Sequence, residues 1–334
     1  MKTKPNSRGG IIVSSIISIL LLGLSAAVIL NRQYLYDQWN VWQYKPTAAI
    51  ANISSEAGLS DTGKFYLYTS DASIDTAQTF NSKCARLEAN NAILGCYANR
   101  KIYIYDVNNS ELNGIEEVTA AHEMLHAAWD RLSDSEKATV GAMLDAEYPK
   151  IVTPDLAARM AYYSKNEPGE RLNELHSILG TEFPNLSPDL EKYYSKYFTD
   201  RQKVTSLHAA YSAVFTSLDT QSKALASELN ALVNKINTDV AQYNAAVTAL
   251  SQEIDALNAS ASSVDRTSWT EVNAYNAKRA ELLARADQLN ATRSAIDAET
   301  ADYKTKLAQY NQLIIHSNEL TASIDSTLTP APSL

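Results

Sequence analysis

Two histidines and one glutamate stand at a spacing that can hold and use a metal ion. His122 and His126 are four residues apart within Val118–Trp129, and Glu123 directly follows the first of them. Because four residues of an α-helix turn through about 400°, both imidazoles would leave one face of the helix and bind the same ion. Glu123 would project about 100° from His122, where it can reach a metal-bound water and act as general base. The pattern predicts a Zn²⁺ site with His122 and His126 as ligands and Glu123 as the catalytic residue.

A hydrolytic zinc site takes three protein ligands and keeps its fourth position for water. Glu174 and His176 are the candidates for the third ligand, and both lie in Glu170–Ser177, a segment without glycine or proline that is predicted to be helical. Residues two apart on a helix point about 200° away from each other, so only one of the two can face the ion. The residues alone leave both possibilities open.

The two segments together resemble the gluzincin clan of zinc metallopeptidases, in which a His-Glu-x-x-His helix is followed by a helix that donates a glutamate. Asn173-Glu174-x-x-Ser177 is similar to the third-ligand segment of thermolysin-like enzymes. The resemblance implies that Glu174, rather than His176, is the third metal ligand and that the domain is zincin-like. It covers only about Ile102 to Glu182. The short glycine-containing extension of metzincins is absent after His126.

Other residues could assist such a site. Asp130 lies one turn after His126 and Glu170 one turn before Glu174, so either carboxylate could orient a ligand, although an ordinary surface position is the alternative. A hydrogen-bond donor that stabilises an oxyanion is also expected, and the candidates are Tyr162, Tyr163 and His208.

One long apolar run lies near the N-terminus. Residues 11–30 carry no charge and at 1.5 Å per residue span about 30 Å, the thickness of a bilayer's hydrocarbon core. Positive charges precede the run at Lys2, Lys4 and Arg8. This asymmetry predicts a single-pass protein of the cell membrane, with residues 1–10 in the cytoplasm and the catalytic domain outside it. A cleaved signal peptide is the alternative, because Ser25-Ala26-Ala27 resembles a cleavage site.

Residues 31–50 form a predicted juxtamembrane segment. It is rich in aromatic residues of the kind that concentrate at lipid headgroups, namely Tyr34, Tyr36, Trp39, Trp42 and Tyr44.

The chain has two cysteines, Cys84 and Cys96. In an exported protein an even pair within one segment predicts a disulfide, and two free buried thiols are the alternative.

Residues 51–199 are predicted to form the zinc metallopeptidase-like domain, of a mostly helical α+β class. Strands are expected at Phe65–Tyr68 and Asn99–Tyr105, and helices over Ile74–Leu87 and from about Gly114. Further helices are expected at Asp134–Tyr148, Pro154–Ser164 and Pro168–Gly180, with another starting at Ser187-Pro188.

Beyond residue 200 the hydrophobic pattern becomes that of long helices. From Val204 to Leu257 apolar residues recur three and four apart, until the polar stretch Asn258–Ser263 interrupts them. A second stripe then repeats every seven residues, at Tyr275, Leu282, Leu289, Ile296, Tyr303 and Tyr310. These patterns predict an antiparallel coiled-coil hairpin over 200–325 and a flexible tail at 326–334. Packing of the second arm on the catalytic domain is the alternative.

The composition of the chain argues against nucleic-acid binding. The formal net charge is −9 and no long basic run occurs, so nucleic acid is not an expected partner. The prediction is a membrane-anchored zinc metalloendopeptidase that hydrolyses a peptide or protein substrate. If the gluzincin arrangement holds, Lys101–Tyr105 would be the edge strand to which an extended peptide adds. The alternative is a non-catalytic surface scaffold whose coiled coil binds a protein partner and whose zinc site is structural or inactive. Glu123 separates the two, because a structural site needs no general base.

Overall fold

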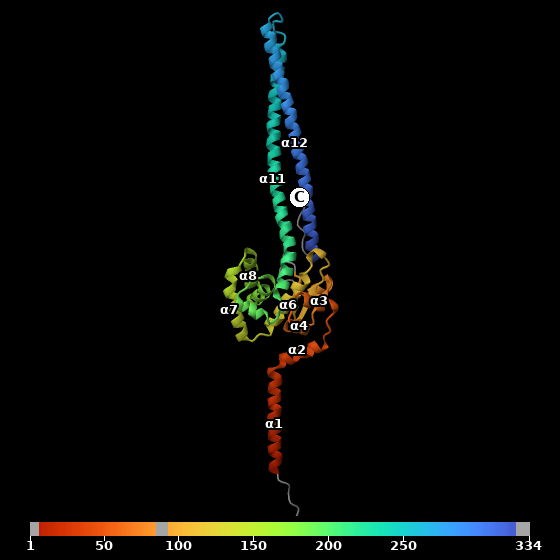
Figure 1. Ribbon diagram of the computed structural model, residues 1–334, viewed down its shortest axis with the longest axis vertical. Coiled ribbons are helices and arrows are strands. Elements are labelled where there is room, and N and C mark those ends of the chain that lie inside the picture. Colours follow the sequence, from red (N-terminus) through yellow and green to blue (C-terminus); the bar gives the residue numbers. More distant parts are fainter. Residues whose placement is uncertain (1–6, 85–92, 325–334) are drawn as a thin grey trace, which may run out of the picture. The chain divides into compact units, whose positions relative to one another are not determined.

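A computed structural model describes residues 7–84 and 93–324, and this part of the chain is mostly helical with one three-stranded sheet (Figure 1). The helices are α1 (Ser7–Leu30), α2 (Arg32–Gln43), α3 (Ala48–Glu56), α4 (Asp61–Thr69), α5 (Ala77–Lys83), α6 (Ile115–Asp130), α7 (Asp134–Ile151), α8 (Pro154–Asn166), α9 (Arg171–Glu182), α10 (Pro188–Tyr194), α11 (Arg201–Ser260) and α12 (Trp269–Ile324), with a short 3₁₀ helix, η1 (Ser110–Leu112). The strands are β1 (Ser73–Asp75), β2 (Gly95–Ala98) and β3 (Lys101–Tyr105). The predicted tail and the start of the predicted cytoplasmic segment lie outside the described residues.

The described chain divides into two compact units, the first extending to Val214 and the second beginning at Phe215, inside α11. The predicted domain division at residue 200 falls where α11 starts.

Helix α6 is the centre of the first unit. It is buried on nearly every side, polar residues included, because other elements cover it almost all round. Its neighbours are α3, α4, α9, β2 and β3. The fully buried residues of α6 are Ala120, Ala121, Met124, Leu125, Ala127 and Ala128. The helix predicted to start near Gly114 is therefore confirmed, with Gly114 as its N-cap residue.

Helix α9 lies close against α6 because its contact residue is a glycine. A Cβ atom at Gly180 would collide with the side chain of Leu125 and come within 2.9 Å of the Tyr194 ring. The absence of that Cβ atom lets the two helix backbones approach. This approach brings the remainder of α9 alongside the histidine face of α6.

The sheet corrects the prediction for the edge strand. β3 pairs in parallel with β1, in the register Ile74 to Ile104, and antiparallel with β2, in the register Tyr97 to Ile102. The strand order is β1-β3-β2, so β3 is central and has no free edge. Lys101–Tyr105 is a strand as predicted, but the free edges belong to β1 and β2.

Two other local predictions are wrong. Phe65–Tyr68 is part of helix α4, because Ser60 caps this helix by accepting a hydrogen bond from the amide of Gly63, and Leu67 alone of the four is fully buried. The helix expected over Ile74–Leu87 is shorter, since Ser73–Asp75 pairs with β3 and only Ala77–Lys83 is helical among the residues described there.

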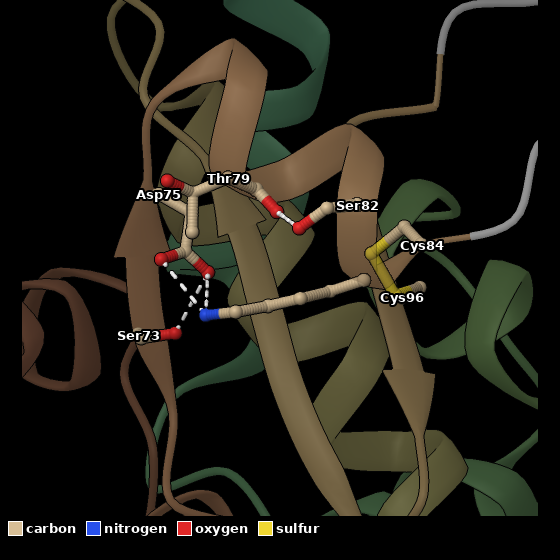
Figure 2. Close-up of a disulfide and its surroundings, with 7 residues drawn as sticks. Ser73, Asp75, Thr79, Ser82, Cys84 and Cys96 are labelled. Carbon is tan, nitrogen blue, oxygen red and sulfur yellow. Dashed lines mark hydrogen bonds and ion pairs between the residues drawn. A yellow bond between two sulfur atoms is a disulfide. The ribbon is translucent and has the colours of Figure 1, made fainter.

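The other local predictions are confirmed, except for the start of one helix. α7 and α8 cover the first two predicted helical segments, and α10 begins at Pro188 with Ser187 as its N-cap residue. The third helix, α9, begins at Arg171 rather than at the predicted Pro168, because Gly169 has a positive φ of 103° and 168–170 form a turn. Figure 2 shows the disulfide between Cys84, which follows α5, and Cys96 on β2. The bond ties β2 to the end of α5.

Helix α1 contains Val13–Leu30, an 18-residue stretch of mean hydropathy 2.5 with no burial inside the structure. Among the residues described it is the single helix long and apolar enough to cross a membrane. A signal sequence near an N-terminus has the same properties.

In the second unit α11 and α12 run antiparallel, side by side (Figure 1). Ion pairs link Glu228 to Lys306, Lys235 to Glu299, and Glu253 to Arg285 and Lys278. The residue number on α12 falls as that on α11 rises, as antiparallel pairing requires.

Helix α2 is attached to the first unit through a buried ion pair. The Arg131 guanidinium donates to both carboxylate oxygens of Asp37, at 2.8 and 2.9 Å, and both side chains are about 5 % exposed or less. The hydroxyl of Thr69 on α4 donates to the Asp37 carbonyl at 3.0 Å, and Asn40 donates to the Thr69 carbonyl at 3.3 Å. These polar contacts fix α2 on the unit.

We expect Asp37→Ala to lower the free energy of unfolding of this unit by about 3–5 kcal/mol, because the Arg131 charge would stay buried without its partner. Asp145→Ala is the matched control, since the exposed pair of Asp145 with Arg171 should contribute less than about 1 kcal/mol. Denaturant unfolding of the purified variants measures both values. Equal losses in the two variants would contradict the structural role of the Asp37 pair.

Candidate metal centre

His122, His126 and Glu174 come together as a group that could hold a metal ion. One ligand atom from each residue lies within 4.8 Å of the other two. Glu174 Oε2 is 3.7 Å from His122 Nε2, and Glu174 Oε1 is 3.5 Å from His126 Nε2. α6 supplies the two histidines and α9 supplies the glutamate. The predicted spacing of the histidines thus places both on one helix face, opposite the predicted third ligand.

The donor atoms fit zinc in type and separation. Two nitrogen or oxygen atoms bound to one zinc ion at about 2.0–2.1 Å in tetrahedral geometry lie about 3.3–3.4 Å apart. The observed separations of 3.5 and 3.7 Å are close to this value but end on different oxygens of Glu174, and with one atom from each residue the group spans up to 4.8 Å, so the side chains would have to close slightly on an ion. The metal's identity is not fixed by the three side chains, since other divalent ions accept imidazole and carboxylate ligands.

The electrostatics of the group favour a cation. Burial opposes ionisation of Glu174, but the imidazoles of His126 and His122 outweigh it and lower the pKa of the Glu174 carboxyl to about 2. For His122, burial acts to lower the pKa. Its hydrogen bond to Glu174 and the charge of Glu123 outweigh burial, so the pKa of His122 is raised. An ionised carboxylate between two imidazoles in a buried place is a ready ligand set for a divalent ion.

A chain of hydrogen bonds sets the orientation of one ligand. His126 Nδ1 lies 2.9 Å from Asn173 Oδ1, and the Asn173 amide donates to Glu170 at 2.8 Å. A histidine that donates its Nδ1 proton leaves Nε2 free to bind a metal. Glu170 therefore contacts the metal group through Asn173.

Glu123 lies beside the group and against strand β2. It is 6 % exposed, and burial raises the pKa of its carboxyl, an effect that His126 and His122 offset only in part. The backbone amide of Tyr97 lies near this carboxylate and acts to lower its pKa, against the larger effect of burial. A Cβ atom at Gly95 would lie 2.8 Å from Glu123 Oε1, so the glycine leaves the room that Glu123 occupies.

His176 is separated from the metal group. It is fully buried among aromatic rings, at 5.3 Å from Trp129 and stacked at 5.5 Å on Tyr194, and its Nε2 lies 3.0 Å from the Tyr193 hydroxyl. Burial, with the nearby charges of His126 and His122, lowers its pKa to about 3. It is a neutral residue of the core.

A cavity of about 560 Å³ adjoins the metal group. Exposed Glu170 is part of its lining, so the cavity reaches the surface. Two of the three predicted oxyanion candidates, Tyr163 and His208, line it, whereas Tyr162 is not among the lining residues. Asp130 is not among the residues that line the cavity either. Its carboxylate accepts a hydrogen bond from the Tyr97 hydroxyl at 3.1 Å.

One wall of the cavity was not foreseen from the sequence. Arg159 on α8 donates two hydrogen bonds to Glu182 on α9, at 2.7 and 2.8 Å, and His208 Nε2 lies 3.6 Å from the same carboxylate. Tyr211 lines the cavity as well. His208 is a candidate from the sequence, but Arg159, Glu182 and Tyr211 are far apart in the chain and belong to no motif, so no sequence signal could have grouped them with it.

Comparison of the chain with protein-family models, with curated proteins and with solved structures finds no match.

Removal of Glu174 should remove the metal. We expect Glu174→Ala protein to hold less than a tenth of the zinc bound by the unsubstituted protein, because two imidazoles alone lack the charged ligand. His176→Phe is the control, since it keeps a ring in the aromatic site and should leave zinc content unchanged. Elemental analysis after dialysis measures both. Metal loss in His176→Phe with retention in Glu174→Ala would show that the ligand assignment is wrong.

Proposed function

We propose that this protein is a membrane-anchored zinc metallopeptidase of gluzincin type, with His122, His126 and Glu174 as ligands and Glu123 as general base. One observation carries the proposal: a buried carboxylate that belongs to no ligand position lies next to a three-ligand group in a cavity open to the surface. A structural zinc site is closed by a fourth protein ligand and has no use for such a carboxylate. Within the described residues, the metal group contains three ligating side chains.

The proposed chemistry divides between the metal and the chain. When bound, the ion would supply Lewis acidity, which polarises a carbonyl and makes a water molecule more acidic. Glu123 would accept a proton from the attacking water and deliver it to the leaving amine. The raised pKa of its carboxyl suits both steps, since it brings proton affinity closer to neutrality.

Strand β2 is the proposed site of substrate binding. Gly95, Cys96 and Tyr97 line the cavity, and β2 is at an edge of the sheet, so its outer side can pair with an extended peptide. Tyr163 and His208 are the proposed donors to the oxyanion, because both line the same cavity.

We also infer that α11 and α12 form the predicted antiparallel coiled-coil hairpin, a possible site for a protein partner. The four ion pairs between them support this, as does burial of Leu282 and Ile296 from the seven-residue stripe. A non-catalytic scaffold built on this hairpin is the competing function.

The test is Glu123→Gln, which keeps the shape of the side chain and removes the base. We expect zinc content to be unchanged and hydrolysis of an unstructured protein such as casein to fall by a factor of roughly 10² or more. Glu117→Gln, on the same helix but outside the cavity lining, should retain full activity. If zinc-loaded unsubstituted protein cleaves none of a broad panel of peptides and proteins, the scaffold function is favoured instead.

For topology, we propose that α1 is the membrane anchor and that residues after it lie outside the cytoplasm. Its apolar stretch and the basic residues Lys2, Lys4 and Arg8 support this orientation.

Protease treatment of intact cells should therefore degrade the first and second compact units. Protection in intact cells, followed by digestion after lysis, would reverse the proposed orientation. Release into the medium of a chain that lacks α1 would show that α1 is a cleaved signal sequence.

A further inference from the structure

Helix α2 buries a charged residue against the protein and exposes most of its large aromatic and aliphatic side chains. Its protein-facing residues include Gln33, Asp37 and Asn40, of which Asp37 is buried. Five aromatic or aliphatic side chains of α2 are strongly exposed, beside the exposed polar residues Arg32, Gln38 and Gln43: Tyr34 59 %, Leu35 46 %, Tyr36 50 %, Trp39 57 % and Trp42 76 %. A surface helix in water shows the opposite pattern, with its apolar side in the core.

The polar residues of α2 that face the protein bond to neighbouring elements of the first compact unit or to one another. Asp37 pairs with Arg131, Asn40 bonds the Thr69 carbonyl, and Tyr44, which follows the helix, donates to the Ala72 carbonyl at 2.6 Å. Gln33 donates to Asp37 at 2.9 Å. α2 therefore cannot turn over to bury its aromatic side without breaking these contacts, including a buried ion pair.

The position of α2 in the chain indicates what covers the aromatic side. Only Asn31 separates α2 from α1, whose apolar stretch ends at Leu30. An apolar surface at the end of a membrane span lies at the depth of the lipid headgroups and upper acyl chains. Tryptophan and tyrosine concentrate there because their rings are apolar and their N–H or O–H groups can reach water. Exposed Arg32 and Lys45 bracket the helix, and both can reach lipid phosphates.

We propose that α2 lies in the membrane interface, with Trp39, Trp42, Tyr34 and Leu35 inserted among the lipids and with Asp37 and Asn40 holding the first compact unit against the bilayer. The proposal rests on the proposed membrane span of α1. The proposal adds to the membrane anchor alone. An anchor joined to the unit by a flexible linker would leave the unit at a variable distance from the membrane. Here the unit is held at the lipid surface, so polypeptide segments near the membrane would be its accessible substrates.

The four tryptophans of the chain allow a direct test on the full-length protein. Trp39 and Trp42 are on α2, Trp129 is 8 % exposed in the core, and Trp269 is 80 % exposed at the start of α12. Protein reconstituted into phosphatidylcholine vesicles is compared with protein in vesicles whose lipids are brominated high on the acyl chain, where bromine quenches only neighbouring tryptophans. We expect strong quenching of the unsubstituted protein, and weaker quenching by lipids brominated near the chain ends.

Tryptophan variants show which residues are quenched by the brominated lipids. The double variant Trp39→Phe with Trp42→Phe should lose it, whereas Trp269→Phe, the matched control that removes an equally exposed tryptophan, should keep it in full. Quenching that persists in the double variant, or that is absent from the unsubstituted protein while it floats with the vesicles, overturns the proposal and leaves the anchor intact. Failure to float with the vesicles overturns both. Protection of Trp39 and Trp42 from aqueous acrylamide without quenching by bromine would identify a protein as the occupant, which also overturns it.

Discussion

The close packing of α9 on α6 is the interaction on which the candidate site depends. α6 carries both histidines and the base, but these three residues form no ligand set until a carboxylate faces them from another element. Gly180 permits the approach of the two helices, because any side chain there would collide with Leu125. Two turns earlier on α9, Glu174 then reaches both imidazoles. Local sequence makes each helix, and one missing Cβ atom allows them to form a site.

Strand β2 contributes the second half of the site, and its position is fixed from three directions. It pairs with β3, the disulfide to Cys84 ties it to α5, and the Tyr97 hydroxyl contacts both Asp130 and Arg131. Arg131 also donates to the Ala127 carbonyl of α6 and to Asp37 of α2. One buried guanidinium therefore connects the helix that carries the two histidines, the strand beside Glu123 and the helix that follows the apolar helix α1. The surroundings of Glu123 and the attachment of α2 share this residue.

Features that depend on residues close together in the sequence could be predicted, whereas features that depend on residues far apart could not. The His122 and His126 spacing, the prolines that start α8 and α10, and the alternation in Lys101–Tyr105 are local signals, and each predicts an element that the structure contains. Pro168 is the exception, since α9 begins only at Arg171. Phe65–Tyr68 was misassigned because a short aromatic run has no clear period, and the cap that decides for helix precedes it at Ser60. The edge strand was misassigned because pairing order is non-local, and Gly95–Ala98 has little strand propensity of its own. The cavity wall of Arg159 and Glu182 arises only from tertiary packing.

The central claim is that this chain binds zinc through two imidazoles and one carboxylate and leaves a position for water. X-ray absorption at the zinc edge, on protein loaded with one equivalent of zinc, tests it directly. The account predicts a four-coordinate first shell of nitrogen and oxygen at about 2.0–2.1 Å, with multiple scattering from two imidazoles. Sulfur in the first shell, a third imidazole, or an ion without imidazole scattering would contradict it.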